Sequence, residues 1–190
     1  MLVASLREAK MPKQRDQFGV PDPRWEHHVV VESESPLRFH FSTVDDLYQQ
    51  IERFTLNETV PEKVRKQFDL ALNLYVYHWF VYDFVTLAEQ QAYAAVEAAL
   101  RYRYREDLGD PNAKGTLKKL LDHAISKGWL NSLEYEFPMP GTPTGKYSTI
   151  EMIRMLRNTL AHGEFHLMQA GSYDSLAYCH RIINRLFPAK

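Results

Sequence analysis

The fold is decided between Glu62 and Glu106, where the chain reads EKVRKQFDLALNLYVYHWFVYDFVTLAEQQAYAAVEAALRYRYRE. This stretch contains neither Gly nor Pro, the two residues that most readily end a helix. Its length, about 45 residues, is unusual for a single helix of a globular protein. We therefore predict either one long helical rod or a helix that is kinked between Tyr75 and Phe80.

Shorter helices are predicted on both sides of this stretch. On the N-terminal side, residues 43–54 carry apolar side chains at helical spacing. Ser42 opens them with a Ser-Thr-Val-Asp sequence that resembles a capping box, with Asp45 in the place of Glu. On the C-terminal side, residues 116–127 form an amphipathic helix that Gly128 ends. Gly109, within Leu-Gly-Asp-Pro, separates this helix from the long run.

The C-terminal third is predicted to hold two more helices. Residues 131–147 contain three Pro and two Gly, which indicates a loop. Ser148 begins the next helix, because Glu151 stands three residues later and completes a capping box. That helix ends at Gly163, and the last one spans roughly 172–186.

The N-terminal segment differs from the rest of the chain. Residues 1–24 combine basic residues with three Pro and read as an arm. Residues 25–41 alternate apolar and polar side chains on both sides of a Ser/Pro turn, which predicts a small β-hairpin. The expected organisation is an arm and hairpin over 1–41 followed by a helical domain over 42–190. The fold class is therefore all-α, a bundle of about five helices with a small N-terminal extension.

Composition excludes several function classes. The chain is 45% hydrophobic and 25% charged with a net charge of −1, so it lacks the overall basic charge of proteins that coat long nucleic acids. A single Cys excludes an intramolecular disulfide and any Cys-based zinc cluster, and favours a cytoplasmic setting. The N-terminus has no apolar stretch long enough for a signal peptide. The longest apolar run, 72–87, is interrupted by polar residues and is too short to span a membrane.

One run of residues in the predicted helix 148–162 carries the chemistry: Arg157-Asn158-Thr159-Leu160-Ala161-His162. Arg157 and His162 are five residues apart, which on an ideal helix separates them by about 140°. Asn158 and His162 share a face. Two arrangements could bring Arg157 and His162 together. Either the helix ends at His162 and frees the imidazole, or a second copy of the chain completes the site across a two-fold axis.

This run closely resembles the Arg-x4–6-His signature of the HEPN superfamily, in the local string Leu156 to Gly163. Residues 94–101, at the end of the long run, are similar to the family's first core helix. Residues 117–124, followed by Gly-Trp-Leu at 128–130, are similar to its middle helix. The resemblance covers roughly residues 65–187.

The resemblance implies a metal-independent endoribonuclease that acts as a homodimer, often as a toxin or defence effector. His162 would be the general acid or base, and an ordinary imidazole titrates near pH ~6.5. Arg157 would stabilise the phosphorane, and Asn158 would position the phosphate or orient His162. The products would carry 2′,3′-cyclic phosphate and 5′-OH ends, and no cofactor or metal would be needed.

The resemblance also leaves an alternative open, because many HEPN domains are non-catalytic modules for nucleotide binding or protein assembly. An antitoxin or regulatory protein is an implied partner. Family members that pair with a nucleotidyltransferase antitoxin carry Tyr two residues after the His. Here that position holds Glu164, so that particular mechanism is not transferred.

Three further residues are weaker candidates. Arg101 and Arg105 share one helix face within Arg-Tyr-Arg-Tyr-Arg, a pattern of alternating cations and aromatic rings that could contact RNA. Glu97 either orients Arg157 or pairs with Arg101 one turn away. His78 lies in an aromatic stretch and is predicted to be a packed residue. No His spacing predicts a metal site.

Overall fold

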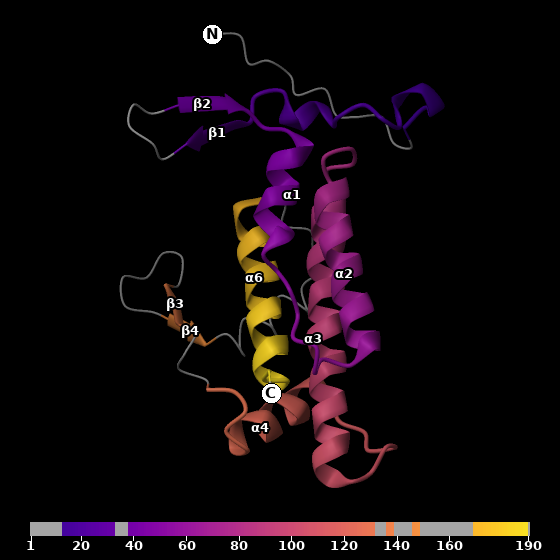
Figure 1. Ribbon diagram of the computed structural model, residues 1–190, viewed down its shortest axis with the longest axis vertical. Helices are drawn as coiled ribbons and strands as arrows, with labels where there is room; N and C mark the ends of the chain where they lie inside the picture. Colours follow the sequence, from indigo (N-terminus) through magenta and orange to yellow (C-terminus); the bar gives the residue numbers. More distant parts are fainter. Residues whose placement is uncertain (1–12, 33–37, 132–135, 139–145, 149–168, 190) are drawn as a thin grey trace.

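The computed structural model describes residues 13–32, 38–131, 136–138, 146–148 and 169–189. Within these residues the protein is predominantly helical, which confirms the predicted fold class. In Figure 1, α1, α2, α3 and α6 run roughly along the long axis of the molecule, with the N-terminal segment across one end and α4 at the other. The five described α-helices are α1 (Val44–Glu52), α2 (Glu62–Tyr77), α3 (Phe84–Leu108), α4 (Leu117–Ser126) and α6 (Gln169–Leu186).

The long Gly- and Pro-free stretch forms two helices that lie side by side, α2 and α3 (Figure 1). A single rod is therefore wrong. The chain breaks where a kink was predicted, but it reverses direction instead of bending. Residues 78–83 make short turn hydrogen bonds, including Phe80 N–H to Tyr77 C=O at 3.0 Å and Phe84 N–H to Val81 C=O at 2.9 Å. The reversal lets both helices bury apolar faces against each other, which a straight rod could not do.

Helix α3 is the centre of the core, because it packs against α2, α6 and α4. Small side chains on α3 let the neighbouring helices approach closely, and Ala88, Ala92, Ala95 and Ala99 are fully buried. The larger core side chains come from the surrounding helices. They include Val64, Phe68 and Tyr75 of α2, Leu120 and Leu121 of α4, and Leu176, Cys179, Ile182, Ile183 and Leu186 of α6.

The helix ends follow local sequence signals. Thr116 caps α4 by accepting the Lys119 N–H, and Gly109 ends α3 with a φ of 63°. A left-handed backbone is strained for residues with a Cβ, so Gly suits this position. The predicted cap of α1 is wrong by one residue. Thr43, not Ser42, accepts a hydrogen bond from the Asp46 N–H, and the carboxylate of Asp46, not of Asp45, accepts one from the Thr43 N–H at 2.7 Å.

The predicted N-terminal hairpin is confirmed as β1 (Val29–Glu32) paired antiparallel with β2 (Arg38–Phe41). It is followed directly by α1. Residues 13–28, which include two short 3-10 helices at Arg15–Gln17 and Pro23–Trp25, lie over the turn between α2 and α3. The Asp22 N–H donates to the Trp79 carbonyl at 2.8 Å, and the Trp25 indole donates to the His78 carbonyl at 3.3 Å. This segment is thus docked on its own helical domain.

The expected loop over 131–147 is corrected in its described parts. Residues Glu136–Pro138 (β3) and Lys146–Ser148 (β4) pair as a second small antiparallel hairpin. Ser148, the predicted cap of the next helix, therefore stands in β4. Strand pairing satisfies backbone groups of this Pro-rich segment that a loop would leave to water. The start of the last helix is also earlier than predicted, at Gln169.

No helix in the described ranges has both the length and the apolar character that crossing a membrane requires.

Candidate functional site

The motif residues Arg157, Asn158 and His162 lie outside the described residues, as does Glu164. The structure therefore does not test their arrangement, and their roles stay predictions. The other predicted site residues lie on α3, where their contacts are defined.

Glu97 and Arg101 form an ion pair on one face of α3. The Arg101 guanidinium donates to Glu97 Oε1 at 2.6 Å, across one helical turn. This is the pairing that was predicted as the alternative to an orienting role for Glu97. Because the Arg101 side chain is 38% exposed, the pair contributes little to stability. Its main effect is to hold the guanidinium against the helix surface.

Arg105 lies one turn further along the same face. Its Nε–H donates to the Ala113 carbonyl at 3.2 Å, which ties the end of α3 to the loop that follows. Arg101 and Arg105 line one surface groove together, as their spacing predicts. Contact of either residue with RNA stays a prediction.

The Arg-Tyr-Arg-Tyr-Arg pattern is not one continuous strip, because the helix distributes its members around the axis. Tyr104 is buried and makes an edge-on contact with the His123 ring at 4.8 Å. Arg103 pairs with Glu106 at 2.7 Å and lies over the Trp129 ring. Tyr102 is 40% exposed, so it is the aromatic ring of the pattern that is open to a ligand.

A groove of about 480 Å³ runs between α2 and α3, and we call it the α2/α3 groove. Ala94 and Ala98 leave space along its floor, since neither has a side chain beyond Cβ. Cationic side chains outnumber carboxylates in its lining, which gives it a positive charge. The lining residues are Lys63 and Gln67 of α2 with Ala94, Glu97, Ala98, Arg101, Tyr102 and Arg105 of α3.

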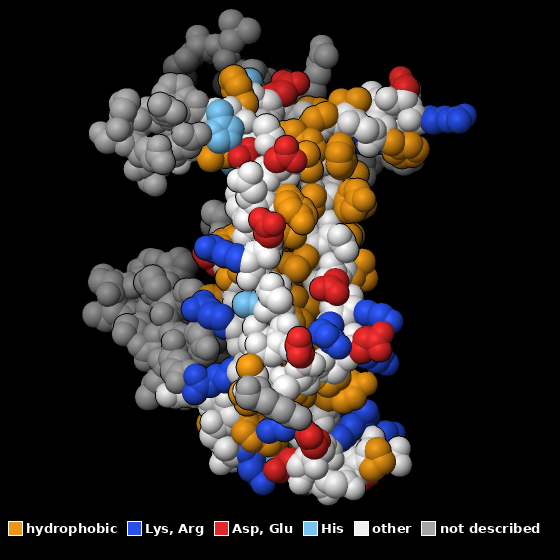
Figure 2. Space-filling view, viewed as in Figure 1, with side chains coloured by type: hydrophobic (Ala, Val, Ile, Leu, Met, Phe, Trp, Pro, Cys, Tyr) orange, Lys and Arg blue, Asp and Glu red, His pale blue; other side chains and the backbone are white. Residues whose placement is uncertain are grey.

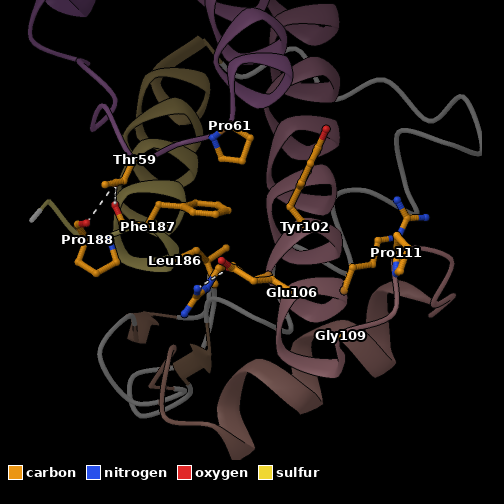
Figure 3. A pocket seen from close by; sticks show the side chains of 11 residues that line it. Thr59, Pro61, Tyr102, Glu106, Gly109, Pro111, Leu186, Phe187 and Pro188 are labelled. Atoms are coloured by element: carbon orange, nitrogen blue, oxygen red, sulfur yellow. Dashed lines mark hydrogen bonds and ion pairs between the residues drawn. The ribbon is translucent and has the colours of Figure 1, made fainter.

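A second hollow of about 900 Å³, the α3-end pocket, adjoins the groove and shares Tyr102 and Arg105 with it. Figure 3 shows Tyr102, Glu106 and Gly109 following one another along α3, with the Phe187 ring pointing toward them. The opposite wall is held in place by Thr59, whose hydroxyl donates to the Phe187 carbonyl at 2.9 Å. Apolar surface therefore continues the charged groove toward the end of α3.

Sequence reasoning missed Lys63, Gln67 and Tyr102 as lining residues. Lys63 and Gln67 lie about 40 residues before Arg101 and Arg105, and only the antiparallel packing of α2 on α3 brings them together. These lining residues could have been predicted only if the chain reversal at residues 78–83 had been predicted first. Tyr102 was part of the recognised pattern, but its exposure depends on which face α3 buries.

A buried polar cluster joins α3 to α6. Burial raises the pKa of Glu89, and hydrogen bonds from Ser172 and Ser175 to its carboxylate lower it in part. Tyr93 donates to the Ser175 hydroxyl at 3.0 Å, and burial raises the pKa of this phenol as well. The cluster fixes the relative positions of α3 and α6, because each of its polar groups needs its partner once water is excluded.

Three histidines of the described ranges, His78, His123 and His180, make structural contacts. His78 is fully buried, as its place in the aromatic stretch predicted. His123 bonds to Asp107 at 2.9 Å, and His180 bonds to the Thr55 carbonyl at 2.8 Å. No group of three or more potential ligands that could hold a metal ion occurs in the described part of the chain.

Comparison of the chain with protein-family models, with curated proteins and with solved structures finds no match.

Proposed function

We propose that the protein is a metal-independent endoribonuclease of the HEPN type. The observation that carries the proposal is the string from Leu156 to Gly163, which places Arg157, Asn158 and His162 at the spacing of the family's signature. The helical bundle is consistent with it, and the two segments that resemble the family's first and middle core helices, residues 94–101 and 117–124, lie within α3 and α4.

The proposed reaction is an intramolecular transfer within RNA. His162 takes the proton from a ribose 2′-OH, and the freed 2′-oxygen attacks the adjacent phosphorus. The bond from phosphorus to the 5′-oxygen breaks, and that oxygen receives as it leaves the proton that His162 took up, directly or through water. Arg157 stabilises the charge on the phosphorane through its guanidinium N–H groups, and Asn158 positions the phosphate. The products carry 2′,3′-cyclic phosphate and 5′-OH ends.

The site is proposed to be shared between two copies of the chain. Arg157 and His162 diverge by about 140° on an ideal helix, so one straight helix does not aim both at the same phosphate. Two motif helices related by a two-fold axis would pair the Arg157 of one copy with the His162 of its partner. A toxin or defence role in the cytoplasm, controlled by an antitoxin or regulatory protein, completes the proposal.

Cleavage of RNA by the purified chain in excess EDTA tests the function. Arg157→Ala and His162→Ala should each abolish cleavage. Arg154→Ala and His166→Ala remove the same side-chain types from the neighbouring sequence and should leave cleavage intact. Cleavage that survives both motif substitutions would come from another site or from a contaminant, and would contradict the proposal.

A non-catalytic assembly module is the second candidate, and the N-terminal hairpin favours it. Val29, Val31 and Phe41 are 43%, 63% and 69% exposed, and the Val29–Phe41 pairing places them on one face of the hairpin. Absence of cleavage across varied RNAs, together with stable capture of a protein through this face, would favour the module over the enzyme.

A further inference from the structure

The α2/α3 groove combines three chemical features that complement one kind of ligand. The first is positive charge, from Lys63 of α2 and from Arg101 and Arg105 of α3. One carboxylate, Glu97, lines the same groove and is paired with Arg101. A guanidinium has five N–H donors, so one bond to Glu97 leaves donors for an anion. Arg101 and Arg105 are one turn apart, about 6 Å along the axis. Figure 2 shows Lys and Arg side chains gathered in the lower half of the molecule, where α2 begins and α3 ends.

The second feature is an unused hydrogen-bond acceptor. The Oε1 atom of Gln67 is buried and accepts no hydrogen bond from the described part of the chain. A buried acceptor without a donor costs free energy, so rotation of the Gln67 amide toward a hydrogen-bond donor of a ligand in the groove gains affinity. A phosphodiester has no donor for this acceptor, whereas a sugar hydroxyl or a base N–H group supplies one.

The third feature is an exposed aromatic ring. Tyr102 is 40% exposed and lies where the groove meets the α3-end pocket, lining both. Bases stack on such rings with little regard to sequence. The lining of the two hollows follows α3 from Ala94 to Gly109, about 22 Å at 1.5 Å per residue, which is longer than a single nucleotide needs.

We propose that the α2/α3 groove binds single-stranded RNA, with phosphates on Lys63, Arg101 and Arg105 and one base stacked on Tyr102. The inference rests on the ribonuclease function proposed above, for which it supplies a substrate-binding surface on the described helices. Neighbouring nucleotides follow α3 into the α3-end pocket. The strand enters as an unpaired chain, because a base stacked on Tyr102 cannot remain in a duplex.

Fluorescence anisotropy with a labelled oligouridylate of about 12 nucleotides tests the inference, since such a strand covers a typical single-strand site. The full chain is used with His162→Ala, which under the proposed function keeps the RNA intact. Lys63→Gln should weaken binding about three- to tenfold and lower the slope of log affinity against log salt by about one. Tyr102→Ala should weaken it about five- to 100-fold, and Tyr102→Trp should restore it.

Lys66→Gln is the matched control, because Lys66 is an exposed lysine of the same helix that pairs with Glu62 and does not line the groove. Its affinity should stay within about twofold of the parent. Lys63 is exposed and outside the core, so Lys63→Gln is informative even where Tyr102→Ala lowers stability.

Three results would overturn the inference. These are unchanged affinity in both Lys63→Gln and Tyr102→Ala, tighter binding of an oligothymidylate DNA of the same length, and full competition by uridine monophosphate at equal nucleotide concentration. The ribonuclease proposal is judged separately. If cleavage requires Arg157 but both Lys63→Gln and Tyr102→Ala bind the RNA as tightly as the parent does, the groove alone is overturned. Groove-dependent binding without cleavage by the unmodified chain supports the groove and contradicts the enzyme.

Discussion

His78 is the residue on which the aromatic end of the bundle is built. Its ring packs between Trp25 and Tyr75, with ring centroids 5.0 and 4.8 Å away, and its Nδ1–H donates to the Tyr75 carbonyl. Burial lowers the pKa of His78 to about 4, although the bond to Tyr75 acts in the opposite direction. The neutral imidazole is therefore the form that this packing requires.

Protonation of His78 in the unfolded chain should make stability depend on pH. The folded pKa of about 4 lies below the ordinary value of 6.5, so the stabilisation is complete above pH 6.5 and is lost as pH falls toward 4. We expect this residue to remove about 2 kcal/mol of unfolding free energy between about pH 7 and about pH 5. Urea denaturation of the wild type and of His78→Phe measures the difference. An equal pH dependence in both proteins would show that His78 does not titrate in this way.

At the scale of elements, the N-terminal segment and the α2–α3 turn stabilise each other. Asp22 is 1% exposed and accepts hydrogen bonds from Arg24 and from the Tyr82 N–H. Burial alone would raise the pKa of Asp22, but these bonds outweigh it and hold the pKa below its usual range. Arg24 also pairs with Asp83, which immediately precedes α3. The carboxylate thus fixes the reversal of the chain as well as the segment that contains it.

Asp22→Ala should therefore destabilise the whole domain, by about 3 kcal/mol, because it leaves the Arg24 and Tyr82 backbone N–H groups without their acceptor and removes one of the two carboxylates that pair with the Arg24 guanidinium. Asp16→Ala is the matched control, since Asp16 is exposed, and should change stability by less than about 0.5 kcal/mol. Thermal or urea unfolding of both variants provides the comparison. Equal stability of the two would mean that the N-terminal segment is not coupled to the helices.

The same contacts explain which elements sequence reasoning could predict. The C-terminal end of α3 and both ends of α4 were predicted correctly, because Gly109, Thr116 and Gly128 act through the backbone within a few residues of themselves. The reversal at residues 78–83 was not, because no Gly or Pro marks it and its stabilising partner, Asp22, lies about 60 residues away. The α2/α3 groove follows from that reversal and was missed with it. Of the candidate site, the shared face of Arg101 and Arg105 was predictable because it follows from helical spacing alone.

At the scale of the whole molecule, the proposed activity depends on two copies of the chain. If Arg157 of one copy acts with His162 of its partner, a mixed dimer of Arg157→Ala and His162→Ala chains retains one intact site. Random exchange should then restore about a quarter of the wild-type activity, although each variant alone is inactive. The cleavage activity is measured after the two variants are refolded together in equal amounts, with the dimer confirmed by light scattering. No recovery from mixed dimers would mean that the site is not shared in this way.

The most direct test of the proposal is the chemistry of the RNA ends. Purified protein is incubated with single-stranded RNA in excess EDTA, and the fragments are analysed by mass spectrometry. We predict fragments that carry 2′,3′-cyclic phosphate and 5′-OH ends, produced by the wild type and by Arg154→Ala but not by His162→Ala. Fragments with 5′-phosphate ends, or no fragments from any RNA, would contradict an Arg157–His162 ribonuclease.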